Sequence, residues 1–199
     1  MIAKKITTHS GEWTGAGFGG RRGLATLLGF HGFSGAGADF EILASKLTAP
    51  VGLVAPNLPG HGSSLRGESG GAQECIRALG HLADAWVQIP TVVMGYSMGA
   101  RLALHFALAF PQKVCGLILI GATAGLENKE DRLARQKSDE ELANWILAHG
   151  VDAFYKRWMS HPLIATQTSI PKPYFEKMQV RKRELSSAGL AWALRALGP

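Results

Sequence analysis

The residues with the clearest chemical potential are Gly95-Tyr96-Ser97-Met98-Gly99. This G-x-S-x-G pattern follows an apolar run, Thr91 to Met94, and comes directly before a helix-forming stretch. In such a strand-to-helix turn, the glycines leave room for a tight backbone, and the serine hydroxyl projects above the sheet. The N–H groups and the positive dipole end of the helix would face an anion beside Ser97. The pattern therefore predicts a reactive serine at position 97.

A second motif, His31-Gly32-Phe33-Ser34-Gly35, directly follows the apolar run from Leu24 to Phe30. Where a serine turn of this kind follows a parallel strand, the loop after a neighbouring strand supplies one N–H group to an oxyanion hole. The residue after the serine supplies the other. The candidate donors are the backbone N–H groups of Phe33 and Met98. For His31 we favour a hydrogen bond that holds the loop over direct catalysis.

A third motif, Asn57-Leu58-Pro59-Gly60-His61-Gly62-Ser63-Ser64, follows the next apolar run. It is similar to a D-x-P-G-x-G-x-S loop, with Asn57 in place of the usual aspartate. We expect a structural role for this loop and do not expect His61 to be catalytic.

The elements that must position these motifs can be predicted from the hydrophobic runs. Continuous apolar runs suit strands that are buried on both faces of a parallel sheet. Here they alternate with helical stretches, which predicts a doubly wound, mostly parallel α/β sheet. The expected strands are 24–30, 52–55, 91–94 and 114–120, and the expected helices are 40–47, 72–86 and 98–110.

Residues 1–23 are rich in glycine and irregular in pattern. Gly15 to Gly20 loosely resembles a dinucleotide-binding loop, but no strand is evident before it and no helix after it. We favour a flexible turn between N-terminal strands.

After Gly121 no further strand is evident. Ser138-Asp139-Glu140-Glu141 has the pattern of a capping box that opens a helix, and Gly150 is a plausible glycine just past its end. We therefore divide the chain into a core of residues 1–121 and a helical cap of residues 122–199. The helices expected in the cap are 138–148, 151–158, 174–184 and 189–197.

Composition and charge narrow the classes of function. Hydrophobic residues make up 46% and charged residues 18% of the 199 residues, which is a globular balance. No apolar run is long enough to span a bilayer, and the N-terminus lacks a secretory pattern. The net charge of +6 is spread among interleaved acids, so we expect no nucleic acid or membrane partner. A small molecule with carboxylates is the better match. Only Cys75 and Cys115 are present, which fits a reducing cytoplasm.

Together the three motifs resemble the α/β-hydrolase superfamily. A narrower similarity, beginning at the elbow Gly95 to Ala103, is to the 2-succinyl-6-hydroxy-2,4-cyclohexadiene-1-carboxylate synthases of menaquinone biosynthesis. The segment from Gly125 to Asp139 adds to it, because it looks like that family's G-L-x(4)-E-x-R-x(2)-R-x(3)-D pattern. The resemblance extends from about Leu27 to the end of the chain.

This resemblance implies an α/β-hydrolase fold that carries a lyase. The family eliminates pyruvate from 2-succinyl-5-enolpyruvyl-6-hydroxy-3-cyclohexene-1-carboxylate, and a serine activated by histidine removes a ring proton. It implies no metal and no organic cofactor. The implied substrate carries several carboxylates, which suits bidentate arginines. The substrate-binding positions carried over are Tyr96, Arg101, Arg135, Trp158 and Arg183, with Arg181 as a rival to the last.

Plainer explanations exist for these side chains. Arg101 follows Ser97 by one helical turn, so it can face a pocket, but it could also lie on the surface. Arg135 lies among acidic residues and could serve only in ion pairs along its helix. Trp158 could simply belong to the packing of the cap.

A triad in this fold runs Ser, then Asp or Glu, then His. After the elbow helix, His149, His161, Asp139 and Asp152 all lie in expected cap helices, and we assign none of them to a triad. We therefore expect the last strands of the fold to be lacking and this chain alone to be nearly inactive. Strand 114–120 would then be an exposed edge, open to a swapped dimer or a complementing chain.

Two other functions remain open. A carboxylester or C–C-bond hydrolase on the same scaffold would form an acyl-enzyme at Ser97, which the lyase would not. A non-catalytic binding module would not depend on Ser97 at all.

Overall fold

The computed structural model describes residues 1–8, 11–19, 26–48, 51–64, 71–87 and 90–198. Six strands form one mixed sheet in the order β1-β2-β4-β3-β5-β6. The strands are β1 (Ile2–Thr8), β2 (Gly11–Phe18), β3 (Thr26–Phe30), β4 (Gly52–Pro56), β5 (Thr91–Tyr96) and β6 (Val114–Ile120). The helices are α1 (Glu41–Lys46), α2 (Gly71–Trp86), α3 (Met98–Ala109), α4 (Lys129–Met159), α5 (Pro162–Ala165), α6 (Lys172–Arg183) and α7 (Ser187–Leu197), with 3-10 turns η1 (Gly37–Phe40), η2 (Pro111–Lys113) and η3 (Thr166–Ser169).

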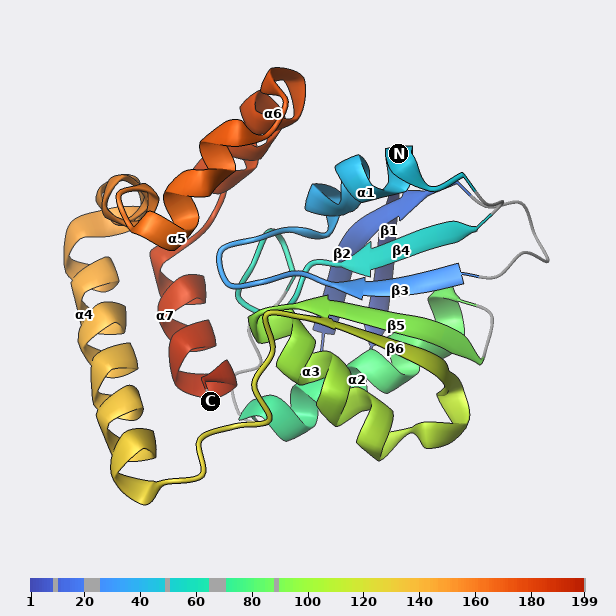
Figure 1. The fold of residues 1–199 in the computed structure, drawn as a ribbon, viewed down its shortest axis with the longest axis horizontal. Coiled ribbons are helices and arrows are strands. Elements are labelled where there is room, and N and C mark those ends of the chain that lie inside the picture. Colours follow the sequence, from blue (N-terminus) through green and yellow to red (C-terminus); the bar gives the residue numbers. More distant parts are fainter. Residues whose placement is uncertain (9–10, 20–25, 49–50, 65–70, 88–89, 199) are drawn as a thin grey trace.

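The predicted doubly wound sheet is confirmed. Strand β3 pairs in parallel with β4 and β5, and β5 pairs in parallel with β6, whereas β2 is antiparallel to both β1 and β4. Helix α1 lies on one face of the sheet, and α2 and α3 lie on the other (Figure 1). Helices α4 to α7 lie beyond the carboxyl ends of the parallel strands, where ligands bind in open α/β sheets.

The central strands are buried on both faces, as their continuous apolar runs predicted. All five residues of β4 are buried. On the α2/α3 face, Phe30, Val93 and Phe106 belong to the largest apolar cluster. On the α1 face, Leu53 and Met94 pack with partly buried side chains from α1. Both faces therefore hold the carboxyl ends of β3 and β5 in place.

The N-terminal region differs from its prediction. Gly15 to Phe18 lies within β2, a regular strand between β1 and β4, and not in a flexible turn. A side chain at Gly15 would place its Cβ only 2.5 Å from the carbonyl oxygen of Ala55. Gly15 therefore allows β2 to lie close to β4. The sequence did not indicate this strand because its residues do not alternate between apolar and polar. Gly20 and the first residues of the predicted strand 24–30 lie outside the described residues.

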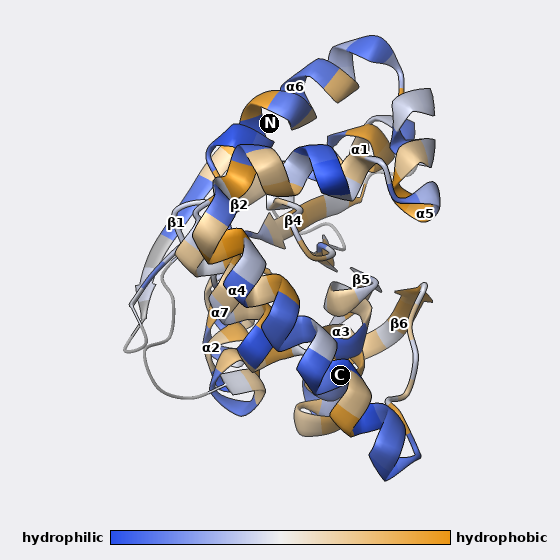
Figure 2. Ribbon diagram, turned by 90° about the vertical axis from the view of Figure 1, so that its left-hand side faces the viewer, coloured by the Kyte–Doolittle hydropathy of each residue, from blue (hydrophilic) through white to orange (hydrophobic). Residues whose placement is uncertain are grey.

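Strand β6 is the last strand of the sheet, as predicted for an uncovered edge. Its apolar residues from Leu117 to Ile120 are each 37–47% exposed. Figure 2 shows β6 as a hydrophobic strand at the border of the molecule.

Helix α4 begins at Lys129, nine residues before its predicted counterpart, which was expected over 138–148. The Asn128 side chain accepts a hydrogen bond from the Glu130 N–H at 3.0 Å and so caps the helix. Ser138 consequently lies inside α4, and its prediction as a helix start is wrong. Gly150, with φ 82° and ψ 170°, interrupts the helix where a terminating glycine was predicted. The two parts of α4 correspond to the expected helices on either side of Gly150.

Helix α7 joins the outer helices to the core. Ala193 and Leu197 belong to the core cluster, whereas Leu190 and Leu194 pack with α4. The backbones of Gly60 and Gly189 approach so closely that a Cβ on Gly189 would lie 2.3 Å from the Gly60 oxygen. Within the described residues, no helix is long and apolar enough to cross a membrane.

Candidate active site

The serine turn has the strained geometry that its pattern predicted. Ser97 has φ 53° and ψ −115°, a conformation rarely adopted by a residue with a side chain. A Cβ at Gly95 would lie 2.3 Å from the Gly99 oxygen, and one at Gly99 would lie 2.2 Å from the Phe30 oxygen. Both glycines are therefore required for β5 to turn directly into α3.

The Ser97 side chain is exposed at the top of this turn, while its backbone is fixed. Its N–H donates to the Ile120 oxygen at 2.8 Å, which ties the turn to β6. The hydroxyl has no hydrogen-bond partner among the described residues. It is thus free to meet a ligand.

A cavity of about 470 Å³ lies next to Ser97, between the core and the outer helices. It brings together six of the predicted site residues: Phe33, Ser97, Met98, Arg101, Arg135 and Trp158. Its wall also includes Asp139, the last residue of the family-like segment, and the α7 residues Ala193, Leu194 and Leu197, for which the sequence carried no recognisable signal. Among the residues that the structure describes, no histidine lines it.

The two predicted arginines face this cavity in different ways. Arg101 is half-buried and donates to the Leu197 carbonyl oxygen at 2.9 Å. Burial lowers the pKa of the Arg101 guanidinium, and the nearby Arg135 lowers it further, whereas Asp139 opposes both. Arg135 donates through Nε to both carboxylate oxygens of Asp139 at 2.9 Å. The plainer expectation of an ion pair along the helix is therefore met, although Arg135 also lines the cavity.

Trp158 both packs in the outer helices and lines the cavity. Its ring lies 5.6 Å from Phe33 and 5.4 Å from Phe154, measured between centroids. The two explanations for Trp158 are therefore compatible, because one face of a large ring can pack while another borders the cavity.

Two buried histidines hold the loop that carries Phe33. His31 Nδ1–H donates to the Gly32 oxygen at 2.8 Å, and its Nε2 accepts from the Leu58 N–H at 2.9 Å. His61 Nε2 accepts from the Ser34 N–H at 3.0 Å, and its Nδ1–H donates to the Pro59 oxygen. Both rings are therefore neutral. The expected loop-holding role of His31 is confirmed.

Burial explains why these rings stay neutral. It lowers the pKa of His31 to about 4, against the opposing effect of the hydrogen bond to Gly32. Burial and the neighbouring His31 also lower the pKa of His61. Asn57 completes the support, since its Oδ1 accepts from the Gly37 N–H and its Nδ2 donates to Thr14 Oγ1.

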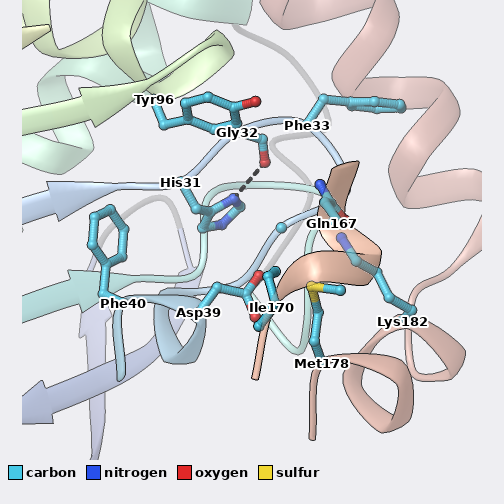
Figure 3. A pocket seen from close by; sticks show the side chains of 11 residues that line it. His31, Gly32, Phe33, Asp39, Phe40, Tyr96, Gln167, Ile170, Met178 and Lys182 are labelled. Atoms are coloured by element: carbon cyan, nitrogen blue, oxygen red, sulfur yellow. Dashed lines mark hydrogen bonds between the residues drawn. The ribbon is translucent and has the colours of Figure 1, made fainter. Parts of the chain in front are cut away.

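Tyr96 lines a second cavity, of about 240 Å³, rather than the one beside Ser97. Of the described residues that line the two cavities, Phe33 is the one common to both. Figure 3 shows the lining side chains of this second cavity, with His31 and Asp39 from the core and Met178 and Lys182 from α6. The prediction that Tyr96 contacts the same ligand as Ser97 thus requires a ligand that reaches past Phe33.

Arg183 is not brought to either cavity. It is exposed and borders a separate hollow with Asp152 and Gln179. Its rival Arg181 forms an ion pair with Asp39 at 2.6 Å. The residue of this basic run that reaches the second cavity is Lys182, because a helix turns successive side chains about 100° apart. The sequence marked the run but not which member faces inward.

Within the described residues, no cluster of histidine, cysteine or carboxylate side chains could hold a metal ion. Cys75 and Cys115 are free thiols, the first buried and the second exposed.

A family model for the alpha/beta hydrolase fold matches residues 25–170, which is most of the chain. The chain belongs to the alpha/beta hydrolase fold family. Its relatives include a putative 2-succinyl-6-hydroxy-2,4-cyclohexadiene-1-carboxylate synthase from Bacillus subtilis, 28% identical over the whole chain and 73% of that protein. The Escherichia coli enzyme of the same name is 29% identical over 74% of the chain, but this match spans only 58% of that relative's length.

Solved structures agree on the fold. MenH from S. aureus aligns with a TM-score of 0.80 at 22% identity, over 92% of this chain and 70% of that one. A carboxylesterase from Nitrososphaera gargenis aligns with a TM-score of 0.78 at 18% identity, over 98% and 71%. At these identities the likenesses show the fold alone.

Proposed function

We propose that the Ser97 cavity serves a lyase that eliminates pyruvate from 2-succinyl-5-enolpyruvyl-6-hydroxy-3-cyclohexene-1-carboxylate. The observation that carries this proposal is that Arg101 and Arg135 line the same cavity as Ser97. Guanidinium groups bind carboxylates through paired, charge-assisted hydrogen bonds. A substrate with several carboxylates would thus be held next to the serine. The relatives named for this reaction support the same proposal.

The chemistry assigned to each group follows from the substrate. The most acidic ring proton is the one next to the succinyl ketone, and Ser97, once deprotonated by a base, would remove it. The negative charge then moves to the ketone oxygen, where the N–H groups of Phe33 and Met98 would stabilise it. The ring C–O bond to the enolpyruvyl group breaks, and the departing enolate gains a proton to become pyruvate. This proposal needs no metal or organic cofactor.

The base for Ser97 does not come from the described part of this chain, because no histidine lines the cavity. A serine hydroxyl without a base is a weak nucleophile and a weak proton acceptor at neutral pH. We therefore expect very slow turnover by the 199-residue chain and a stimulation by imidazole added in solution.

Binding and pyruvate release test the proposal separately. Calorimetry with the substrate should show Arg101→Met and Arg135→Met binding roughly tenfold to a hundredfold more weakly, the usual loss for a charged hydrogen bond. Arg132→Met is the matched control on the same helix, because Arg132 donates instead to the backbone oxygens of Leu126 and Glu127. Pyruvate formed with imidazole present should disappear in Ser97→Ala. Equal binding by all four proteins would contradict the proposal.

A carboxylester or C–C-bond hydrolase is the second candidate, because the strained, exposed Ser97 suits acyl transfer equally well. It predicts a covalent acyl group on Ser97 after incubation with a slow ester and imidazole, detected by intact-protein mass. The lyase proposal predicts pyruvate release with no covalent adduct. The two outcomes therefore distinguish the candidates.

A further inference from the structure

Asp139 differs from the other acidic residues, because it is the one buried carboxylate in the described part of the chain. It lies on α4 one turn after Arg135, and its side chain is 11% exposed. Both of its oxygens accept from Arg135 Nε at 2.9 Å. A buried carboxylate is costly unless it is paired, so this contact matters more than an ion pair on the open surface of a helix.

The contact with Asp139 occupies only one edge of the Arg135 guanidinium. A guanidinium has five N–H donors, and Nε carries a single one of them. The donors on the two terminal nitrogens of Arg135 have no hydrogen-bond partner among the described residues. Because Arg135 also lines the Ser97 cavity, these donors are available there to a carboxylate of a ligand.

Asp139 is also what keeps the Arg135 side chain in one place. This side chain is 46% exposed, and Asp139 is its one ion-pair partner within the described residues. An arginine that becomes ordered only when a ligand arrives loses side-chain conformational entropy at that moment. An arginine that is already held by the protein does not, so its ligand binds more tightly.

The same carboxylate separates two like charges in the cavity wall. The positive charge of Arg135 lowers the pKa of the Arg101 guanidinium, whereas Asp139 raises it. These three are the ionisable side chains among the described residues that line the cavity, and together they leave one net positive charge. Asp139 therefore lets two arginines share one wall, although its charge also weakens the attraction for an anionic ligand.

We propose that Asp139 is a positioning residue of the Ser97 cavity, which holds Arg135 through Nε so that the terminal nitrogens are presented to a carboxylate of the ligand. This role rests on the proposed function, because it takes Arg135 to be a carboxylate-binding residue. Positioning and charge act in opposite directions here. Loss of positioning weakens the binding of an anion, whereas loss of the Asp139 charge by itself strengthens it.

Calorimetry with succinate, a small dicarboxylate, separates the two effects in the full chain. Asp139→Asn removes the charge but keeps the size and one acceptor oxygen, and we expect it to bind succinate about threefold to tenfold more weakly. In an Arg135→Met background the same change should leave binding unchanged or make it tighter, because only repulsion by Asp139 is then removed. Glu141→Gln is the matched control and should bind as the parent does, since it breaks the Lys137–Glu141 pair at the same spacing on exposed side chains of α4.

The outcomes that contradict the proposal are specific. Equal weakening in both backgrounds would show that Asp139 has a merely structural role. Unchanged or tighter binding by Asp139→Asn alone, or no binding of succinate by the parent, would overturn the proposal as well. None of these titrations measures pyruvate. A parent that releases pyruvate without coupling between the two positions refutes this proposal alone, and coupling without pyruvate release refutes the lyase alone.

A measurement on the parent does not depend on whether Asp139→Asn folds. In a chain labelled with ¹⁵N at its arginines, the Arg135 Nε–H signal is assigned by its loss in Arg135→Met. We expect this hydrogen to exchange with water about tenfold more slowly than that of Arg77, which is exposed on α2. Succinate should leave the Nε–H signal nearly unshifted, because Asp139 already accepts this hydrogen. Exchange as fast as that of Arg77 would show that Arg135 is not held and would overturn the proposal.

Discussion

The two sides of Ser97 differ in how completely the described residues of this chain satisfy the polar groups and cover the apolar side chains that lie there. Toward β3, two neutral histidines fix the loop that carries Phe33, and each ring uses both nitrogens. Toward β6, the apolar residues from Leu117 to Ile120 are exposed and no base reaches the serine from the described residues. The contacts on the β3 side of the sheet are therefore enough to fix the conformation of the serine turn, although the apolar residues of β6 on the other side remain exposed. Positioning Ser97 and activating it are separate tasks for this fold.

The largest effect is expected where the β3 side is tightest. Gly99→Ala would force a Cβ to within 2.2 Å of the Phe30 backbone oxygen, and we expect a loss of about 3 kcal/mol in the free energy of unfolding by urea. Gly17→Ala is the control, because its Cβ would meet a flexible Lys4 side chain first, at 3.1 Å. Similar losses in the two variants would show that the serine turn is not especially constrained.

The buried histidines make the β3 side sensitive to acid. Unfolding exposes His31, whose pKa then returns from about 4 to about 6.5, so the unfolded chain binds more protons between these values. Stability should therefore fall as the pH decreases from 6.5 to 4, by about 3 kcal/mol from His31 alone. The lowered pKa of His61 acts with the same sign.

Urea unfolding across this pH range measures the effect. His31→Gln, which keeps an acceptor for the Leu58 N–H, should be less stable at neutral pH but should lose less on acidification. His105→Gln, on the exposed side of α3, serves as the control and should follow the parent. An unchanged slope in His31→Gln would contradict the role of this ring.

The exposed β6 edge should cause copies of this protein to associate. Exposed apolar strand edges pair with other chains, so we expect this protein to self-associate with increasing concentration in sedimentation experiments. Replacing Ile118 and Ile120 by lysine should weaken association tenfold or more, since each buried isoleucine contributes roughly 1.5–3 kcal/mol. Leu108→Lys on α3, at a residue 71% exposed but away from the edge, is the control. A monomer at all concentrations would contradict this prediction.

The smallest effect concerns the segment that leads from β6 to α4. Asn128→Ala removes the helix cap and should cost about 1 kcal/mol of unfolding free energy. Ser138→Ala, within the same helix, should change stability by less than about 0.5 kcal/mol. The reverse order would restore Ser138 as the start of an independent helix.

Much of the fold was predictable because its signals are local. Four strands and the helices between them follow from continuous apolar runs. The strand-to-helix turn at Ser97 follows from the spacing of its two glycines, although only Gly95 is required by a neighbour in the sequence, Gly99, whereas Gly99 is required by the distant Phe30 backbone. The structural role of His31 was also foreseeable, since its loop must be fixed for Phe33 to have a defined place. The predicted helix start at Ser138 was wrong because a capping-box pattern has the same sequence whether it lies at the start of a helix or inside a longer one. Only the position of the true start, after Asn128, distinguishes the two cases.

The sequence by itself determined the family and the serine turn, because both depend on motifs of neighbouring residues. It also determined that β6 lies at the edge of the described sheet, because this follows from the order of the apolar runs. Only the tertiary structure decided which distant side chains meet. It placed Arg101 and Arg135 beside Ser97, sent Tyr96 and Lys182 to the neighbouring cavity, and left Arg183 outside both. The physical reason is that successive side chains of a helix point about 100° apart, so the rotation of α6, which is set by packing against remote elements, decides which member of its basic run faces inward.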